Sequence, residues 1–441
     1  MLNPLEYYQP TIPDLPIHPM RARRQRRSSD LNHIRDHDRA AHDWYRFVLS
    51  FPPHLVQKHL KDFAIRPDQT VLDPFCGTGT TVVECKKLGI PSVGVEANKM
   101  AWFAGTTKVN WHMEADRLMA HATQIAELAH ANLDQPLRTL DEERSQLLLK
   151  NSISELPLHK ALVLLDQLEQ HRDENCDRYE KLALAKILVY SVSNLKFAPE
   201  VSVGKYKQDA PVIELWLNEM QQISRDLQHL HPLKEIPATV HHADSRSLLQ
   251  VLEPNSIDAV ITSPPYPNEK DYTRATRLES VVLGFLQTKI DLRSMKQGLM
   301  RSNSRGVYRT DDDDHWVANH PEIQRIAAEI EAKRIELKKT SGFERQYARA
   351  TKLYFGGMAR HLADLRQALR PGAQLAYVVG DQASYFRVMI RTGELIADLA
   401  KSLGYEVVDI ELFRTRLATA TKEQLREEVV LLKWNGSESQ Y

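Results

Sequence analysis

Apolar and polar positions alternate regularly over two parts of the chain. In residues 44–111 and 236–434, short apolar runs rich in β-branched residues are separated by longer amphipathic stretches, which predicts buried strands alternating with helices. The predicted strands span residues 71–73, 91–96, 238–244, 258–261, 374–380, 406–413 and 428–434. This order predicts an α/β fold with a mostly parallel, seven-stranded sheet, helices on both faces and the last two strands as an antiparallel pair at its edge.

Two segments interrupt this alternation. Residues 112–235 hold long Leu- and Ala-rich stretches at helical period, which predict a helical insertion broken by a loop over residues 196–210. Residues 291–350 form a second predicted insertion. Its stretch 301–309 is basic, small and aromatic without an acid, which suits a flexible loop closing on nucleic acid and equally an ordinary surface loop. The aspartates at 311–314 are predicted to form a solvated acidic turn or helix start.

The composition is that of an ordinary globular protein, with 42% hydrophobic residues. Lys plus Arg equals Asp plus Glu at 58 each, so the net charge neither supports nor excludes a nucleic-acid partner. The three cysteines have no metal-ligand spacing, and the adjacent His241 and His242 would point to opposite faces of a strand, so no metal site is predicted. Without a membrane-length apolar run or a signal-peptide core, a cytoplasmic protein is predicted.

A tight turn with two glycines follows the first predicted strand. Gly77 and Gly79 permit close backbone approach, and the helix that begins near Thr80 offers free N–H groups. Glu96 ends the next strand about 20 residues further on, where a Rossmann-like unit places a carboxylate on a ribose diol. The order of strand, glycine turn, helix, strand and acid predicts an adenosine-containing cofactor. The glycine spacing is not that of dinucleotide-binding proteins, which disfavours NAD.

The third predicted strand ends at Asp244. Its carboxylate suits the amino group of an adenine, and it equally suits capping of the next helix.

The strand at residues 258–261 is followed by Ser-Pro-Pro-Tyr at 263–266. A strand must stop there because proline has no N–H for a ladder. The strand end therefore presents a hydroxyl, two proline carbonyls and an aromatic ring in a stiffened loop, at the place where open α/β sheets bind ligands. This set suits a flat heterocycle with an exocyclic amine, because it offers acceptors for the amine and a ring to stack on.

The two loops together resemble the exocyclic-amino DNA methyltransferases, which use S-adenosyl-L-methionine. The resemblance rests on Asp-Pro-Phe-Cys-Gly-Thr-Gly-Thr at 73–80 and Thr-Ser-Pro-Pro-Tyr at 262–266, with similar features at 51–53, 271–274 and 283–284. It covers residues 44–111 and 236–434, and implies a Rossmann-like class I methyltransferase fold with a base flipped out of the duplex. The cofactor motif precedes the catalytic motif here, which departs from many members with this form of the motif.

The resemblance also implies site residues. The implied cofactor site consists of Phe51, Pro52, Asp73, Phe75, Cys76, Gly77, Thr78, Gly79, Thr80, Glu96 and Asp244. In that site Asp73 faces the amino group of the methionine moiety, Glu96 the ribose and Asp244 the adenine. The implied catalytic residues, which hold the target base, are Ser263, Pro264, Pro265 and Tyr266. Serine at 263 favours cytosine N4 as the target over adenine N6; guanine N2 of tRNA and an inactive nucleic-acid-binding protein are further alternatives.

DNA is the implied partner, and a restriction or phage-defence protein is a further candidate. The predicted DNA contacts are Arg23, Arg24, Lys205, Lys207, Tyr272, Arg274, Arg301, Arg305 and Arg309. The first two lie in a basic, Pro-rich arm, which is equally well explained as solvated. The predicted organisation is the arm (1–40), a cofactor-binding half (41–111), the helical insertion (112–235), a catalytic half (236–290), the second insertion (291–350) and the C-terminal part of the core (351–441), with both insertions proposed for target recognition.

Overall fold

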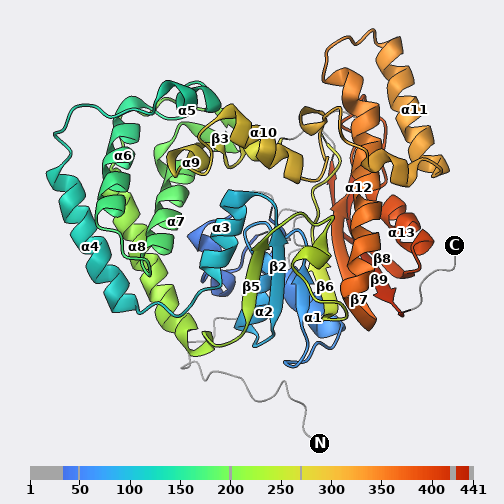
Figure 1. Cartoon of the computed structure of the whole chain (residues 1–441), viewed down its shortest axis with the longest axis horizontal. Coiled ribbons are helices and arrows are strands. Elements are labelled where there is room, and N and C mark those ends of the chain that lie inside the picture. Colours follow the sequence, from blue (N-terminus) through green and yellow to red (C-terminus); the bar gives the residue numbers. More distant parts are fainter. Residues whose placement is uncertain (1–32, 48–49, 198–200, 269–270, 418–423, 437–441) are drawn as a thin grey trace, which may run out of the picture.

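The computed structural model describes residues 33–47, 50–197, 201–268, 271–417 and 424–436 (Figure 1). A seven-stranded sheet at its centre has the strand order β5-β2-β1-β6-β7-β9-β8. These strands are β1 (Val71–Asp73), β2 (Ser92–Glu96), β5 (Ala238–His242), β6 (Ile257–Thr262), β7 (Leu369–Gly380), β8 (Glu406–Leu417) and β9 (Gln424–Trp434). The first five in spatial order run parallel, and β9 pairs antiparallel with both β7 and β8. The predicted Rossmann-like methyltransferase fold class is therefore confirmed.

Helices cover both faces of the sheet. Side chains alternate between the two faces along each strand, so successive residues of one strand pack against helices on opposite sides. Val71 of β1 packs in the same cluster as α1 (Pro53–Asp62) and α2 (Thr80–Lys87). The next residue, Leu72, packs in the cluster formed by α12 (Tyr347–Ala368) and α13 (Thr392–Ser402). Burial on both faces explains why the strands are almost continuously apolar in sequence.

The chain reverses its direction of travel across the sheet between β1 and β6. It first moves outward from β1 through β2 to β5, then returns to build β6 and β7 on the other side. Strands β1 and β6 pair in parallel, with Val71 opposite Ala259 and Leu72 opposite Val260. Their carboxyl ends therefore lie side by side at the position where open α/β sheets bind ligands.

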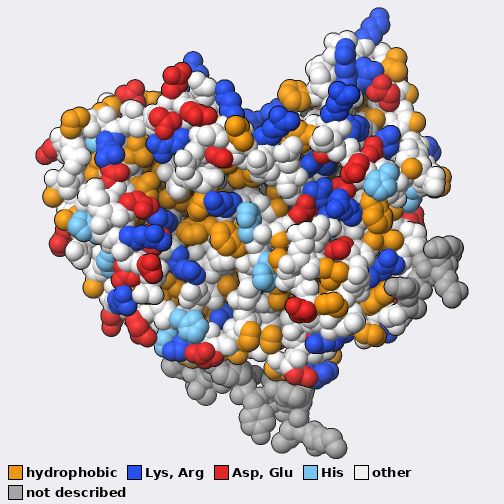
Figure 2. All heavy atoms as spheres, viewed as in Figure 1, with side chains coloured by type: hydrophobic (Ala, Val, Ile, Leu, Met, Phe, Trp, Pro, Cys, Tyr) orange, Lys and Arg blue, Asp and Glu red, His pale blue; other side chains and the backbone are white. Residues whose placement is uncertain are grey.

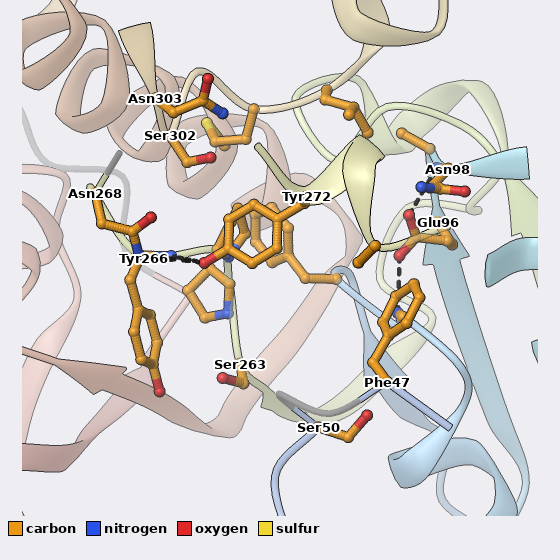
Figure 3. A pocket seen from close by; sticks show the side chains of 18 of the residues that line it. Phe47, Ser50, Glu96, Asn98, Ser263, Tyr266, Asn268, Tyr272, Ser302 and Asn303 are labelled. Carbon is orange, nitrogen blue, oxygen red and sulfur yellow. Dashed lines mark hydrogen bonds between the residues drawn. The ribbon is translucent and has the colours of Figure 1, made fainter. Parts of the chain in front are cut away.

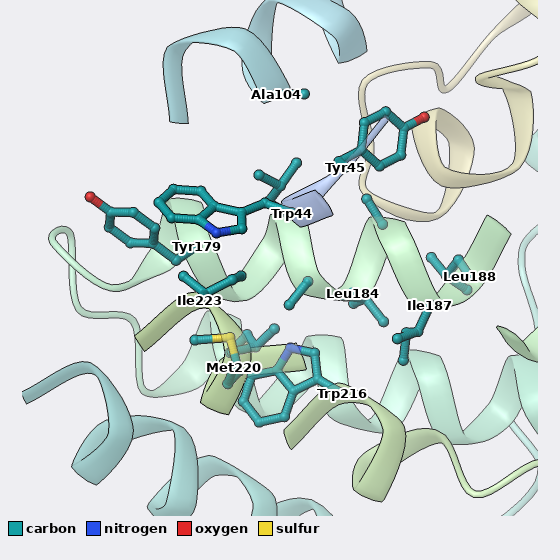
Figure 4. Close-up of a cluster of buried hydrophobic side chains, with 14 of the residues drawn as sticks. Trp44, Tyr45, Ala104, Tyr179, Leu184, Ile187, Leu188, Trp216, Met220 and Ile223 are labelled. Carbon is teal, nitrogen blue, oxygen red and sulfur yellow. The ribbon is translucent and has the colours of Figure 1, made fainter. Parts of the chain in front are cut away.

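The segment 112–235 is a helical lobe beside α3 (Lys99–Lys108), as predicted (Figure 1). Its helices are α4 (Ala115–Ala131), α5 (Glu142–Leu147), α6 (Glu155–Gln170), α7 (Asp177–Ile187) and α8 (Val212–Leu230). Figure 4 shows Trp44, from the segment ahead of the sheet, packed among side chains of this lobe. The Trp44 indole N–H donates to Asp226 Oδ2 at 2.8 Å, and its ring meets Tyr179 edge-on. The lobe thus shares one core with the sheet domain.

The predicted loop at 196–210 contains more regular structure than expected. Strands β3 (Leu195–Phe197) and β4 (Val201–Val203) form an antiparallel pair. Gly204 N donates to the carbonyl of Asn194 at 2.6 Å, which closes the base of the pair. The polar composition concealed these two strands.

The second insertion is also more ordered than predicted. It contains α10 (Lys289–Gly298), short helices at Ser304–Gly306 and Asp313–Val317, and α11 (Pro321–Glu336). Arg301 is buried, and its guanidinium donates to both carboxylate oxygens of Asp311 at 2.9 Å. The carboxylate of Asp313 is held by Arg246 at 2.5 Å and by Arg360 at 3.1 Å. The expectation of a flexible loop was wrong for residues 301–304, which are buried, whereas Arg305 and Arg309 are exposed. At 311–314 the predicted helix start is found, since a short helix begins at Asp313, but the Asp313 carboxylate is buried in its ion pairs and not solvated.

The helix α9 (Arg277–Val282) follows β6, a π-helical turn (Leu188–Val192) extends α7, and several single-turn helices connect the longer elements. None of the helices in the described part of the chain combines the length and apolar character needed to cross a bilayer.

We predict that Gly94 on β2 is required for the position of the glycine turn. A Cβ atom at Gly94 would lie 2.5 Å from the Sγ atom of the buried Cys76. Gly94→Ala should therefore lower the free energy of unfolding by about 1–3 kcal/mol through overpacking, measured by urea denaturation. Gly342→Ala is the control, because a Cβ there meets no atom within 4 Å. Equal effects of the two substitutions would contradict this explanation.

Candidate active site

A cavity of about 570 Å³ opens at the carboxyl ends of β1, β2 and β6. Its volume lies within the range of roughly 300–1,000 Å³ that is usual for small-molecule sites. The turn after β1 and the loop after β6 both line it, so the two predicted loops face the same space. Figure 3 shows Glu96 and Asn98 on one side of the cavity, Ser263 and Tyr266 on the other, and Tyr272 between them.

The glycine turn and Glu96 are joined by backbone hydrogen bonds. Gly77 adopts a φ of 53°, and its N–H donates to Glu96 Oε2 at 2.8 Å. The N–H of Asn98 donates to the other oxygen of Glu96 at 2.6 Å. Burial raises the pKa of the Glu96 carboxyl to about 7, against the effect of these two donors. The carboxyl is thus held rigidly at the wall of the cavity with lone pairs left to accept further hydrogen bonds.

Asp73 connects the two halves of the site from below. Its Oδ1 accepts from Phe75 N at 3.1 Å and from the hydroxyl of Thr262 at 2.5 Å. Its Oδ2 is buried and has no hydrogen-bond partner among the described residues. Burial raises the pKa of this carboxyl to about 6. A buried acceptor without a donor is costly, and Asp73 lies beneath the cavity without belonging to its lining.

The catalytic loop presents acceptors toward the cavity. The Ser263 hydroxyl donates to the carbonyl of Val378 on β7 at 3.0 Å, which leaves the lone pairs of its oxygen available. The ring of Tyr266 lies against Gly380, where a Cβ atom would come within 3.0 Å of Tyr266 Cε2. Its backbone N–H donates to the Tyr272 hydroxyl at 3.4 Å. The loop is therefore fixed from two sides, by β7 and by the turn at Tyr272–Arg274.

Most of the predicted cofactor residues line the cavity, and the rest support it. The lining includes Phe51, Phe75, Cys76, Gly77, Thr78, Thr80 and Glu96. Pro52 begins α1 as its N-cap, and Gly79 has a φ of 90° with its Cα packed against Gly105. These two residues shape the backbone and, like the buried Asp73 beneath the cavity, do not belong to the lining.

Asp244 does not occupy the position that was predicted for it. Its carboxylate is paired with the Arg246 guanidinium at 2.6 Å and also accepts from Arg246 N at 2.9 Å. It is absent from the cavity lining, to which the neighbouring Ser245 belongs. Neither alternative for Asp244 is found: it meets no cavity, and the next short helix (Leu248–Gln250) has Ser247 as its N-cap. The prediction for Asp244 is therefore corrected: its carboxylate binds Arg246 and not a ligand or a helix N-terminus.

The predicted DNA contacts have different surroundings. Tyr272, Arg274 and Arg301 line the cavity, but Arg301 is buried in its ion pair with Asp311, so its assignment as a DNA contact is corrected to a structural one. Lys207 donates to the carbonyl of Ser191 at 2.6 Å. Lys205, Arg305 and Arg309 are exposed, whereas Arg23 and Arg24 lie outside the described residues.

Sequence patterns missed a buried histidine that connects three parts of the site. His361 on α12 contacts the carbonyl of Ser245 through Nδ1 at 2.8 Å and the hydroxyl of Tyr377 through Nε2 at 2.7 Å. A carbonyl only accepts, so Nδ1 carries the proton and Nε2 accepts from Tyr377. Burial lowers the pKa of His361 to about 4, which agrees with a neutral ring. The ring of Phe75 meets the imidazole edge-on at 4.9 Å.

Lys108 on α3 is a second residue that the sequence did not single out. Its buried ammonium donates to the carbonyls of Thr78 at 2.7 Å and Tyr45 at 3.1 Å. Burial lowers its pKa to about 7. It therefore anchors the glycine turn to the segment before α1. In the sequence, Lys108 is one more polar position on a predicted helix, and the pattern of apolar and polar residues does not show that its side chain is buried.

One cluster of possible metal ligands occurs in the described part of the chain. His121, Cys176 and Glu180 place ligand atoms within 4.8 Å of one another in the helical lobe. Both ring nitrogens of His121 are already engaged, Nδ1 with Glu180 at 2.6 Å and Nε2 with the carbonyl of His171 at 2.9 Å. None of the three residues lines the cavity.

Comparison with known proteins agrees with this geometry. A family model described as DNA methylase, for N6 and N4 methyltransferases, matches residues 19–102. The Type II methyltransferase M.BsoBI of Geobacillus stearothermophilus is 25% identical over 423 residues, which cover 88% of this chain and 82% of that protein. The Type II methyltransferase M.AvaI of Nostoc sp. (strain PCC 7120) is 20% identical over 414 residues, which cover 86% and 82%. The resemblance to the exocyclic-amino DNA methyltransferases is confirmed.

The chain is thus similar to DNA methyltransferases of the N6 and N4 type, and this likeness together with the fold implies S-adenosyl-L-methionine as the methyl donor. Among solved structures, TrmN from Thermus thermophilus is similar at 12% identity with a TM-score of 0.27, over 87% of this chain and 48% of that chain. That likeness is too weak to support an argument, and the fold assignment rests on the strand order.

We predict that His361 positions the methyl-donor side of the cavity. His361→Phe removes the donor to Ser245 and should weaken binding of the methyl donor about tenfold, equivalent to about 1.4 kcal/mol. Titration calorimetry measures this affinity. Tyr377→Phe is the matched control, since it keeps the contact between Nδ1 and Ser245; it should lower the free energy of unfolding by about 1 kcal/mol and leave the affinity nearly unchanged. Equal losses of affinity in both variants would show that the effect spreads through the core.

Proposed function

We propose that this DNA methyltransferase transfers the methyl group to the exocyclic N4 of a cytosine flipped out of the duplex, within one short recognition sequence. The observation that carries the proposal is the shared cavity, in which the glycine turn after β1 and the Ser-Pro-Pro-Tyr loop after β6 face one another. Serine at position 263, in place of the aspartate associated with adenine targets, favours cytosine.

The residues present suit S-adenosyl-L-methionine. When bound, it supplies an electrophilic methyl group on a sulfonium centre. The unpartnered Oδ2 of Asp73 suits its cationic amino group, and the Glu96 carboxyl suits its ribose hydroxyls. Thr78 also has a buried hydroxyl without a partner among the described residues. Phe51 and Phe75 supply apolar walls. Ser245, held by His361, takes the place at the adenine that was predicted for Asp244.

The catalytic loop acts on the amine of the target base. An aryl amine is a poor nucleophile, because its lone pair is delocalised into the ring. The Ser263 oxygen and the Pro264 carbonyl accept hydrogen bonds from the two N–H groups and so favour a pyramidal nitrogen with a localised lone pair. This works at Ser263 because its own proton is committed to Val378. The ring of Tyr266 offers a stacking surface that offsets part of the cost of unstacking the base, which is a few kcal/mol.

Adenine N6 is the second candidate target, because the same two acceptors suit its amine. A restriction or phage-defence protein is the proposed further partner, and the relatives' description as Type II methyltransferases supports the restriction candidate. Guanine N2 of tRNA is the less favoured target, since M.BsoBI and M.AvaI are both described as Type II methyltransferases.

Expression in a host without DNA methylation, followed by sequencing of modified bases, tests the proposal and the role of Tyr266 together. We expect N4-methylcytosine in one short motif. Tyr266→Ala should retain binding of the methyl donor and lose turnover by at least about a hundredfold, since base stacking contributes about 1–3 kcal/mol per base and positioning adds to it. The control is Tyr206→Ala, an exposed tyrosine that does not line the cavity. N6-methyladenine in the motif would assign the alternative target.

We also predict a pH dependence of binding of the methyl donor. The carboxyls of Asp73 and Glu96 have pKa values raised by burial to about 6 and about 7. Protonation removes the charge that a cationic ligand needs, so affinity should be highest above pH 7 and fall as the pH drops through 7 and then 6. In Glu96→Gln, the part of this fall near pH 7 should disappear. Calorimetry at several pH values measures both.

A suitable control for the pH experiment is Glu279→Gln. Burial raises the pKa of the Glu279 carboxyl to about 8, but the residue accepts from the Tyr45 hydroxyl and does not line the cavity. Its replacement should leave the pH dependence of binding unchanged, and a matching change would mean that Glu96 is not the titrating group.

A further inference from the structure

A second hollow of about 380 Å³ adjoins the cavity where the two insertions meet. It is lined by Leu147 and Leu149 of the helical insertion, by Asp271, Arg274 and Arg277 of the catalytic half, and by Lys296, Arg305 and Phe343 of the second insertion. Asp271, Arg274 and Lys296 line both spaces, so the hollow lies directly beside the cavity. Figure 2 shows Lys and Arg side chains along the notch between the two lobes.

The charge of this hollow is strongly positive. Four of its side chains are cationic and one is a carboxylate. That carboxylate, Asp271, is already engaged: it accepts from Lys296 Nζ at 2.7 Å and from the hydroxyl of Thr273 at 2.6 Å. Within the described part of the chain, Arg274, Arg277 and Arg305 form no ion pair with a carboxylate. The hollow therefore has three arginines that no carboxylate among the described residues contacts.

Arg277 is the most informative of these groups. Its Nη2 donates to the Thr273 hydroxyl at 2.7 Å and its Nη1 to the carbonyl of Leu147 at 3.3 Å. Its Nε is buried and has no hydrogen-bond partner among the described residues. A buried guanidinium N–H without an acceptor is unfavourable, and an anion bound in the hollow would satisfy it.

We propose that this hollow binds a phosphodiester of the DNA strand beside the target nucleotide, with Arg277 as the central contact and Arg274, Lys296 and Arg305 around it. The inference rests on the proposed function and adds the position of the backbone. The walls fit this ligand: Leu147, Leu149 and Phe343 are apolar and suit the sugars, while the cations suit the phosphates between them. Arg305 is exposed and its guanidinium lies 5.2 Å from the centre of the Phe343 ring, so it can serve as the first contact for an approaching strand.

The site is mechanically connected to the catalytic loop. Arg277 holds Thr273, whose hydroxyl donates to Asp271. Tyr272 lies between Asp271 and Thr273 in the chain, and its hydroxyl accepts from the backbone N–H of Tyr266. A phosphate on Arg277 therefore sets the position of the DNA strand relative to the loop that receives the base.

The experiment compares wild type, Arg277→Gln and a control, Arg325→Gln, on a duplex that carries the motif found by modification mapping. Arg325 lies on α11, pairs with Glu322 and lines neither space. We expect Arg277→Gln to bind DNA at least about tenfold more weakly and to reduce the slope of log Kd against log salt concentration by about one. Its affinity for S-adenosylhomocysteine should equal that of wild type. The control should match wild type in all three measurements.

A neutral methylphosphonate, placed at one phosphate at a time next to the target cytosine, locates the contact. At one position it should weaken wild-type binding and leave Arg277→Gln unaffected. Loss of affinity at every position in both proteins, or a wild-type salt slope in Arg277→Gln, would overturn the proposal. If Arg277→Gln does not fold, Arg305→Gln, at an exposed position, provides the same test.

Two further outcomes separate the possible errors. Binding of inorganic phosphate to wild type but not to Arg277→Gln, together with full DNA affinity in the variant, would assign the hollow to free phosphate and overturn the proposal. Failure of wild type to methylate DNA would instead refute the proposed function and, with it, the phosphate site that rests on it.

Discussion

The parallel pairing of β1 with β6 is the constraint on which the site depends. It places two strand ends side by side, and the hydroxyl of Thr262 at the end of β6 donates directly to Asp73 at the end of β1. This buried hydrogen bond fixes the loops that leave the two strands relative to one another. Methyl transfer demands reacting atoms held close together and in line, so the distance between these loops decides whether the chemistry is possible.

The parts outside the sheet keep that arrangement rigid. Lys108 anchors the glycine turn from the helical side, and His361 anchors Ser245 and Phe75 from the α12 side. On the catalytic side, β7 accepts from Ser263 and leaves room for Tyr266 at Gly380. Each contact is a buried polar or close-packed interaction, which is costly to leave incomplete. The cavity is therefore walled by groups whose positions are set by the whole fold.

Local patterns in the sequence predicted the strands, the two loops and Glu96, because each depends on residues that are adjacent in the chain. The same patterns did not predict the role of a residue whose contact partner is distant in the sequence, or whose nearby partner the pattern of apolar and polar positions does not mark. Arg301 was expected to contact DNA, but Asp311 and three backbone carbonyls enclose it. Asp244 was expected near a ligand or a helix end, but Arg246 takes it. His361 could not be recognised at all, since its role depends on Ser245, which lies 116 residues away.

The neutral net charge concealed a separation of charge within the site. The carboxyls of Asp73 and Glu96 lie at the end proposed for a cationic methyl donor, and their pKa values are raised because burial leaves them without a counter-ion. Arg274, Arg277 and Arg305 lie at the other end, where a polyanion would approach. Each end of the site also holds a buried polar atom without a hydrogen-bond partner among the described residues, Oδ2 of Asp73 at one end and Nε of Arg277 at the other. If the two proposed ligands bind there, each would supply a partner for one of these atoms, and the charge at each end would favour the ligand of opposite sign.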